Sequence, residues 1–336
     1  MRAIVTGANG MLGRSLVRLL AARDADEVTV LVRADALRAF RRFLGGEELT
    51  ERVRIIEGEL STGGAPAAEF GDADHVFHLA GRSDWGLAPA GMAAAAGRDC
   101  QLAGVAADLA IACGARRLHA PSLIWAGNAA PPVVAVKRAE EQYLLGSGAP
   151  VRIYRLPVLA GRADTGEADA HGALNGLHAV VRLLATQLPA SATLELPIDG
   201  RLQVLPVDVA AAALLALAHA ELDGPVVTVA NPEPVPLAEV LNGLSAAAGG
   251  PRFSGRLPVA DVEAEAQQWL IADALLRGLL ARAGCPPVLL EWLRQPVTPP
   301  DSQVMGLLES AGVRIPAWAD YGGRGYRYWQ YALDRG

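Results

Sequence analysis

The sequence of 336 residues contains a single lysine, Lys137. Apart from it, the residues counted as lysine or arginine are all arginines. Its net charge of −6 and its scattered arginines form no basic stripe, so the sequence gives little support for a nucleic-acid partner or an anionic membrane partner. The three cysteines form no CxxC pair and leave an odd count, which fits reduced thiols better than a disulfide framework. We therefore expect a cytoplasmic protein.

Long apolar runs and metal motifs are also missing. The longest apolar run covers residues 209–218, whereas a membrane span requires about 18 residues. The N-terminal MRAIVTGANG reaches a turn too early to hold a signal-peptide core. The sequence has no HxxxH or CxxC spacing and no GxSxG elbow. A metal site and a serine hydrolase are therefore disfavoured.

Short β-rich runs alternate with stretches of helical period through the first half of the chain. This alternation predicts a Rossmann-type α/β fold, a doubly wound parallel sheet with helices on both faces. We expect an NADP-binding domain over residues 1–160, with its sheet completed by segments near 202–231. Residues 161–336 would form an interleaved, smaller, mainly helical substrate lobe. The aromatic segment at the C-terminus is expected to dock on the core.

The segment TGANGMLG follows the first expected strand and opens the first expected helix. Three glycines at this junction allow a tight turn, close approach to a pyrophosphate and close helix packing. The start of the helix offers N–H groups to the phosphates. The predicted dinucleotide-binding residues of this segment are Thr6, Gly7, Asn9, Gly10, Met11, Leu12, Gly13 and Arg14.

The end of the second expected strand indicates which dinucleotide is bound. An acidic residue there would bind the ribose 2′-hydroxyl of NAD(H), and an arginine would accommodate the 2′-phosphate of NADP(H). The strand ends in Arg33, and Arg14 follows the last glycine of the loop. The sequence therefore favours NADP(H) over NAD(H).

These residues and several later motifs resemble the extended short-chain dehydrogenase/reductases. The later motifs are GEL at 58–60, VFHLAG at 76–81 and PSLIWAG at 121–127. HGALN at 171–175 and LPVDVAAA at 205–212 look most like the thioester-reductase branch, which reduces carrier-bound acyl thioesters with NADPH. The resemblance implies that Ser122 is the catalytic hydroxyl. It adds Glu59, Leu60, Leu79, Ala80 and Gly81 to the cofactor site.

The family's YxxxK motif is present only in part. Lys137 occupies the lysine position, on a helix expected from about Val133 to Leu145, and the resemblance implies that it contacts the nicotinamide ribose. The tyrosine position is Val133, which has no hydroxyl to donate or accept a proton. A positioned general acid contributes about 10²–10⁴-fold to a rate, so the chain is expected to be an atypical member.

Three functions remain open. In the first, the protein is an NADP(H)-dependent oxidoreductase of a biosynthetic acyl-thioester, carbonyl or alcohol intermediate, and another group supplies the proton. The candidates for that group are Ser122, Ser83, Asp84, His171, His178 and water. In the second, it is a non-redox cyclase, isomerase or dehydratase, and in the third an NADP(H)-binding sensor or scaffold. The substrate would be a small molecule or a carrier- or CoA-bound group, and a homodimer is possible.

Overall fold

A computed structural model describes residues 1–60, 67–81, 89–127, 132–168, 174–195, 200–254, 274–283 and 296–334. The strands of the main sheet are β1 (Arg2–Thr6), β2 (Glu27–Val32), β3 (Val53–Glu57), β4 (His75–His78), β5 (Arg117–Leu123), β6 (Val151–Leu156) and β11 (Val226–Thr228). The helices between them are α1 (Met11–Ala21), α2 (Ala34–Gly46), α3 (Pro89–Ala112), α4 (Pro132–Gly146) and α6 (Val207–Ala218), with 3₁₀ turns η1 (Ala67–Glu69) and η2 (Ile124–Gly127).

The main sheet has seven strands in the order β11-β6-β5-β4-β1-β2-β3, and every pairing is parallel. This result confirms the predicted doubly wound Rossmann-type fold. The strand order reverses between β1 and β4, and the carboxyl ends of these two neighbouring strands are where such folds bind ligands. The ends of β1, β4 and β5 therefore define the region in which a site is expected.

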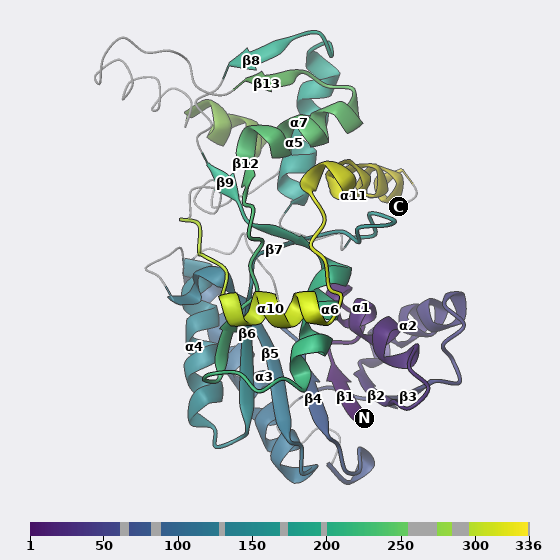
Figure 1. Cartoon of the computed structure of the whole chain (residues 1–336). Coiled ribbons are helices and arrows are strands. Elements are labelled where there is room, and N and C mark those ends of the chain that lie inside the picture. The colour runs from purple at the N-terminus through teal and green to yellow at the C-terminus, as the bar shows by residue number, and fades with distance from the viewer. Residues whose placement is uncertain are drawn as a thin grey trace.

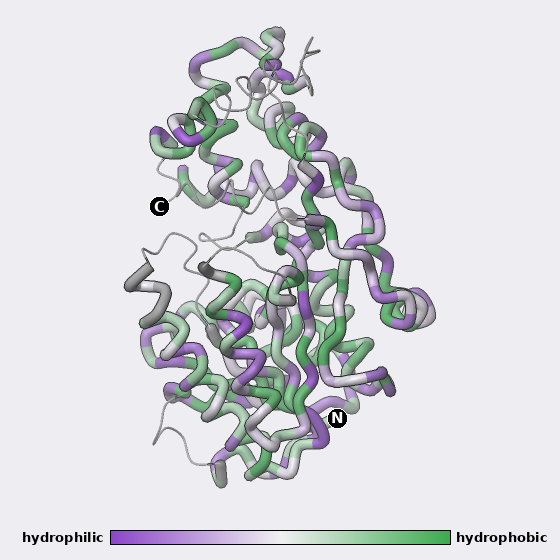
Figure 2. The backbone as a smooth tube through the Cα atoms, turned by 90° about the vertical axis from the view of Figure 1, so that its left-hand side faces the viewer, coloured by the Kyte–Doolittle hydropathy of each residue, from purple (hydrophilic) through white to green (hydrophobic). Residues whose placement is uncertain are grey.

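Helices cover both faces of the sheet, as its apolar strands require (Figure 1). On one face, α1, α2 and α6 pack on β1 and β2 through a core that includes Leu16, Phe40 and Ala211. On the other face, α3 packs through Ala103, Ala106 and Ala110. Figure 2 shows green and purple alternating along helices of this larger lobe, as expected for helices with one apolar side. Among the described residues, no helix is both long and apolar enough to cross a membrane.

The remaining elements form a smaller lobe at one end of the molecule (Figure 1). Its strands are β7 (Val158–Ala160), β8 (Thr193–Glu195), β9 (Arg201–Leu202), β10 (Val204–Pro206), β12 (Val235–Pro236) and β13 (Arg252–Ser254). Its helices are α5 (Asn175–Gln187), α7 (Leu237–Ala248) and α11 (Trp318–Leu333), while α10 (Ser302–Ser310) packs on α6 in the larger lobe. Of the segment near 202–231 that we expected to complete the sheet, β11 does so beside β6. In contrast, β9 and β10 pair with β12 and β7 instead.

The C-terminal aromatic segment forms α11 and docks on the smaller lobe. Trp318, Tyr321 and Tyr326 are buried in the same apolar core as α5 and α7. Gly322 lies so close to the Trp318 ring that a Cβ there would collide with it. This packing agrees with the expectation that the terminal aromatics dock on the core.

Candidate cofactor and active site

The glycine-rich loop packs directly against the end of β4. Gly7 has φ +72°, and a Cβ at this position would collide with the backbone of Leu79 and Ala80. A Cβ at Gly13 would collide with the Gly7 carbonyl oxygen, so the first turn of α1 lies against the loop. No side chain caps α1 at its N-cap residue, Gly10. Because a helix start without a side-chain cap is suited to an anion, this loop fits a dinucleotide pyrophosphate.

Two polar residues of the loop are fixed by partners within the chain. The Thr6 Oγ1 atom lies 3.0 Å from Nδ1 of His78, which joins β1 to β4. The Arg14 guanidinium donates to Asn9 Oδ1 at 2.8 Å and lies 5.5 Å from the ring centre of Phe43 on α2. Met11 and Leu12 form the first turn of α1. The loop is therefore held in shape by contacts that need no ligand.

The remaining predicted cofactor residues lie at the ends of β2, β3 and β4. Arg33 follows β2 and is exposed, with Asp35 as an ion-pair partner at 3.0 Å. Glu59 is exposed after β3, whereas Leu60 is half-buried against the sheet core. Gly81 is exposed at the end of β4. These positions border the carboxyl edge of the sheet, where the cofactor site was predicted.

His78 is a packed histidine, as its place within a strand-end motif suggested. It is 1% exposed, and burial together with the nearby charge of Lys137 lowers its pKa to about 3. With so low a pKa the imidazole is neutral near neutral pH, so it lacks the imidazolium proton that a general acid would donate. His78 therefore contributes structure rather than acid catalysis.

Ser122 lies near the end of β5 and is 7% exposed. Its Oγ atom is buried without a hydrogen-bond partner among the described residues. Buried hydroxyls are normally hydrogen-bonded, so an unmet one at the ligand edge of the sheet is suited to a substrate oxygen. Ser122 is thus placed where the resemblance requires the catalytic hydroxyl.

Lys137 extends from α4 toward the end of β4. A Cβ built on Gly81 would lie 3.5 Å from Lys137 Nζ. Nζ lies 2.6 Å from Glu140 Oε2, one turn along α4, and 4.0 Å from Asp99 Oδ2 on α3. Burial lowers the pKa of Lys137, but these two carboxylates outweigh burial, and the pKa lies above its ordinary value. The single lysine is therefore a charged group within the predicted site.

Hydrogen bonds hold helix α4 to the turn that follows β5 and to the neighbouring strand β6. Arg138 donates through Nε to the Ala126 carbonyl oxygen at 2.9 Å. Arg155, the ladder partner of Ser122 on β6, donates to both carboxylate oxygens of Glu141 at 3.1 and 2.7 Å. These bonds fix the face of α4 that carries Lys137 relative to the end of β5.

Neither tyrosine near the site can replace the missing phenol. Val133 lies in the first turn of α4. Tyr143 is 51% exposed and its hydroxyl lies beside Gly104 on α3. Tyr154 is fully buried, and its hydroxyl lies 2.8 Å from Nδ1 of His119. Both phenol groups therefore have places elsewhere in the fold.

Three of the candidate proton donors, Ser83, Asp84 and His171, lie outside the described residues. His178 is described and lines a small cavity between α1, β7, α5 and α11, together with Met11, Ala160 and Tyr321. Burial lowers the pKa of His178 to about 3, so its imidazole is neutral. His178 therefore lacks the imidazolium proton of a general acid near neutral pH.

The sequence matches the NAD dependent epimerase/dehydratase family over residues 3–181, more than half of the chain. The chain belongs to this family. The family's description is of NAD-dependent enzymes, and it supports the prediction of an enzyme with a nicotinamide cofactor. Among curated proteins, no sequence matches this member of the family.

Solved structures share the fold of this epimerase/dehydratase family member across nearly all of the chain. The terminal R domain from the myxalamid PKS-NRPS pathway has 21% identity and a TM-score of 0.71, covering 100% of this chain and 91% of the other. A thiolation-reductase di-domain from an archaeal non-ribosomal peptide synthetase has 14% identity and a TM-score of 0.73, covering 99% and 76%. UDP-glucuronic acid 4-epimerase from Bacillus cereus, in complex with NAD, has 15% identity and a TM-score of 0.67, covering 100% and 99%.

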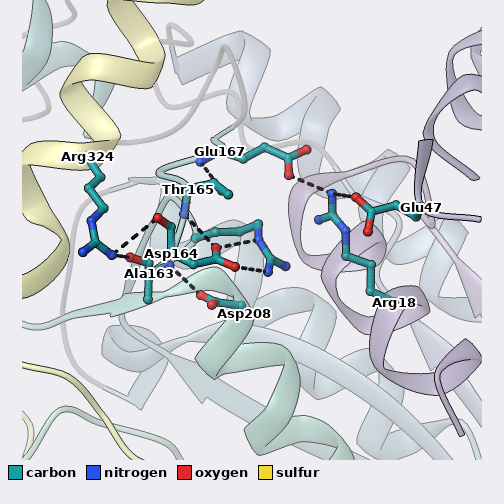
Figure 3. A network of polar contacts seen from close by, with 9 residues as sticks. Arg18, Glu47, Ala163, Asp164, Thr165, Glu167, Asp208 and Arg324 are labelled. Atoms are coloured by element: carbon teal, nitrogen blue, oxygen red, sulfur yellow. Dashed lines mark hydrogen bonds and ion pairs between the residues drawn. The ribbon is translucent and has the colours of Figure 1, made fainter.

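Sequence reasoning missed the polar network that joins the smaller lobe to the Rossmann helices (Figure 3). Arg18 on α1 donates to Glu47 after α2 and to Glu167 in the loop after β7, each at 2.8 Å. The Ala163 N–H donates to Asp208 on α6 at 3.0 Å, and Arg324 on α11 donates to the Ala163 carbonyl oxygen. No sequence motif marks these pairs, which are far apart along the chain. The network fixes the smaller lobe beside the glycine-rich loop.

Proposed function

We propose that the protein is an atypical NADP(H)-dependent oxidoreductase of an acyl-thioester, carbonyl or alcohol intermediate of a biosynthetic pathway, working without the family's tyrosine. The observation that carries this proposal is the buried Ser122 hydroxyl, which has no hydrogen-bond partner among the described residues and lies on the strand next to the one that packs against the glycine-rich loop. Ser122 would donate a hydrogen bond to the substrate oxygen and polarise its carbonyl group.

The cofactor would be held by the glycine-rich loop and by the ends of β2 to β4. The first turn of α1 would bind the pyrophosphate, and Arg33 and Arg14 would bind a 2′-phosphate. Lys137 would contact the nicotinamide ribose. A bound NADPH would supply the hydride for the reduction.

A thioester substrate is supported by two of the structural neighbours, a terminal R domain and a thiolation-reductase di-domain of peptide or polyketide assembly lines. A carrier protein or CoA would then present the acyl group to the end of β5. A small-molecule carbonyl would need no such partner. We therefore include both substrate forms in the proposal, and a homodimer remains possible.

The direct test follows NADPH absorbance with acyl thioesters of N-acetylcysteamine and CoA, with aldehydes and with ketones. The proposal expects substrate-dependent NADPH oxidation and a product that has gained two hydrogens. Unchanged absorbance with every substrate would refute the oxidoreductase function. Loss of turnover in Ser122→Ala with unchanged NADPH affinity would separate the role of the hydroxyl from cofactor binding.

A non-redox cyclase, isomerase or dehydratase is the second candidate function. The absence of a hydroxyl at Val133 favours it, as does a family description that names epimerases and dehydratases. A product of unchanged mass, or one that has lost only water, would support this alternative. An NADP(H) sensor or scaffold is the third candidate, and it predicts tight cofactor binding without turnover of any substrate.

A further inference from the structure

Lys137 lies among acidic side chains at the edge of the predicted cofactor site. Its ammonium forms a short ion pair with Glu140 and has Asp99 as a second acidic neighbour, at 2.6 and 4.0 Å. Both carboxylates are at most 5% exposed, whereas the Lys137 side chain keeps 20% exposure. Two buried carboxylates therefore lie close to one ammonium, which is carried by a partly exposed side chain.

The position of this ammonium is defined by three elements. Glu140 lies on α4 itself, Asp99 approaches from α3, and the Gly81 backbone at the end of β4 lies on the ligand side. The other titratable groups that act on Nζ in the described chain are Cys100 on α3 and the neutral His78 on β4. Among these groups, the Lys137 ammonium is the positively charged one, and it lies beside the end of β4.

We propose that Lys137 is the proton donor of the reaction in place of the missing tyrosine, and that Glu140 and Asp99 are positioning residues that keep its ammonium charged. The proposal rests on the proposed oxidoreductase function and names the group which that function lacked. Val133 offers no hydroxyl, Tyr143 and Tyr154 are engaged elsewhere, and His78 and His178 are neutral.

The step balances as follows for a substrate carbonyl. The carbon gains the hydride, the electron pair of the C=O π bond moves to oxygen, and that oxygen takes a proton from Nζ to become a hydroxyl. A thioester would give a hemithioacetal at this stage, which then loses its thiol to leave the aldehyde. The Lys137 amine regains its proton from solvent through its exposed fraction.

The chain offers a direct test because Lys137 is its only lysine. Labelling with ¹³C-lysine gives a single side-chain signal whose titration reports the charge of Nζ with no substrate present. In the unaltered protein the signal should keep its ammonium position beyond the pH at which an ordinary lysine loses its proton, because the two carboxylates raise the pKa of Lys137. In Glu140→Gln it should titrate about one pH unit or more lower, because one opposing charge is gone. Asp99→Asn repeats the test from α3 if the first variant does not fold.

The matched control is Glu239→Gln, which makes the same change at an exposed position on α7 of the smaller lobe. Its lysine titration should be unchanged. The kinetic readout is the alkaline limb of kcat/KM for NADPH oxidation. In Glu140→Gln this limb should move to lower pH together with the lysine signal.

The outcomes separate the two proposals. A lysine signal unaffected by both Glu140→Gln and Asp99→Asn would overturn the positioning role. A shifted signal with an unmoved alkaline limb would overturn Lys137 as the proton donor while leaving the oxidoreductase function in place. Absence of NADPH oxidation in the unaltered protein would refute the proposed function, and with it the donor role, even if the lysine titration shifts as expected.

Discussion

The glycine-rich loop and the face of α4 that carries Lys137 lie at neighbouring strand ends, but the sequence specifies them differently. The loop depends on absent side chains, since a Cβ at Gly7 or Gly13 would collide with backbone. The α4 face depends on particular side chains, with Lys137 paired to Glu140 and Asp99. A glycine packed against backbone atoms cannot gain a side chain without a collision, whereas one proton-donating side chain can be exchanged for another group. This difference explains how one end keeps the family pattern while the other departs from it.

The largest expected effect on turnover comes from replacing Lys137 on α4. Lys137→Met removes the proposed proton donor but keeps an unbranched side chain of similar length. We expect kcat/KM for NADPH oxidation to fall by about 10²–10⁴-fold, the usual contribution of a general acid. Steady-state kinetics with the best thioester or carbonyl substrate would measure it. A loss of less than about fivefold would show that the α4 end does not supply the proton.

The second prediction concerns the Ser122 hydroxyl near the end of β5, which Ser122→Ala removes. Removal of a single hydrogen-bond donor to a developing oxyanion costs about 10²–10³-fold in kcat. The cofactor affinity should be unchanged, because the glycine-rich loop lies at the ends of other strands. Kinetics and calorimetry on the same preparation would test both parts. Equal losses of turnover and of NADPH affinity would contradict the claim that the Ser122 hydroxyl acts on the substrate and not on the cofactor.

At the loop end, Gly13→Ala should weaken NADPH binding at least tenfold. The added Cβ would collide with the Gly7 carbonyl oxygen, and overpacking of this kind costs about 1–3 kcal/mol. Gly45→Ala on α2 is the matched control, because a Cβ there meets no atom within 4 Å. Calorimetry and chemical unfolding should show a loss of affinity and of stability only in the first variant. Comparable behaviour of the two variants would refute the requirement for glycine.

A smaller effect is expected on the preference for NADPH over NADH. Arg33→Ala should lower the preference for NADPH over NADH by about tenfold, because a hydrogen bond to a charged group is worth about 1.5–3 kcal/mol. Arg33 is exposed beside Asp35, so its removal should leave the free energy of unfolding unchanged. Affinities for both reduced cofactors would be compared. An unchanged preference would assign the 2′-phosphate to Arg14 or leave the chain with no preference for NADP(H).

A prediction of a different kind concerns the pH dependence of stability. The pKa values of buried His75, His78 and His178 lie at about 4, 3 and 3, mainly because of burial, below the ordinary value near 6.5. The unfolded chain therefore binds more protons, so stability is complete above about pH 6.5 and falls as the pH drops toward 4. Urea unfolding over this range should show the decline. His178→Leu should flatten it, and an equally steep decline would contradict the assignment.

The sequence predicted the parts of the molecule that depend on local pattern. Strand and helix alternation, the turn at Gly7 to Gly13 and the helix around Lys137 all arise from residues close together along the chain. The partners of Lys137 were not predicted in the same way. Glu140 lies at helical spacing i+3 and could have been recognised as a neighbour. Asp99 could not, because only the packing of α3 on α4 brings it within 4.0 Å.

The placement of the smaller lobe was equally beyond sequence reasoning. The bond from Arg18 to Glu167 joins residues 149 positions apart, and no periodic signal marks either one. The burial of His178 likewise depends on α11, which is the last helix of the chain. Pairings of this kind follow from the tertiary fold and not from the local pattern.

The central claim is that the cofactor end of the site is complete although the tyrosine is missing. Calorimetric titration of the purified protein with NADPH, NADP⁺ and NADH tests it most directly. We predict binding of NADPH and NADP⁺ with a clear preference over NADH, weakened by Lys137→Ala. Binding of none of the three would contradict the claim and would leave a Rossmann-type fold whose cofactor role has been lost.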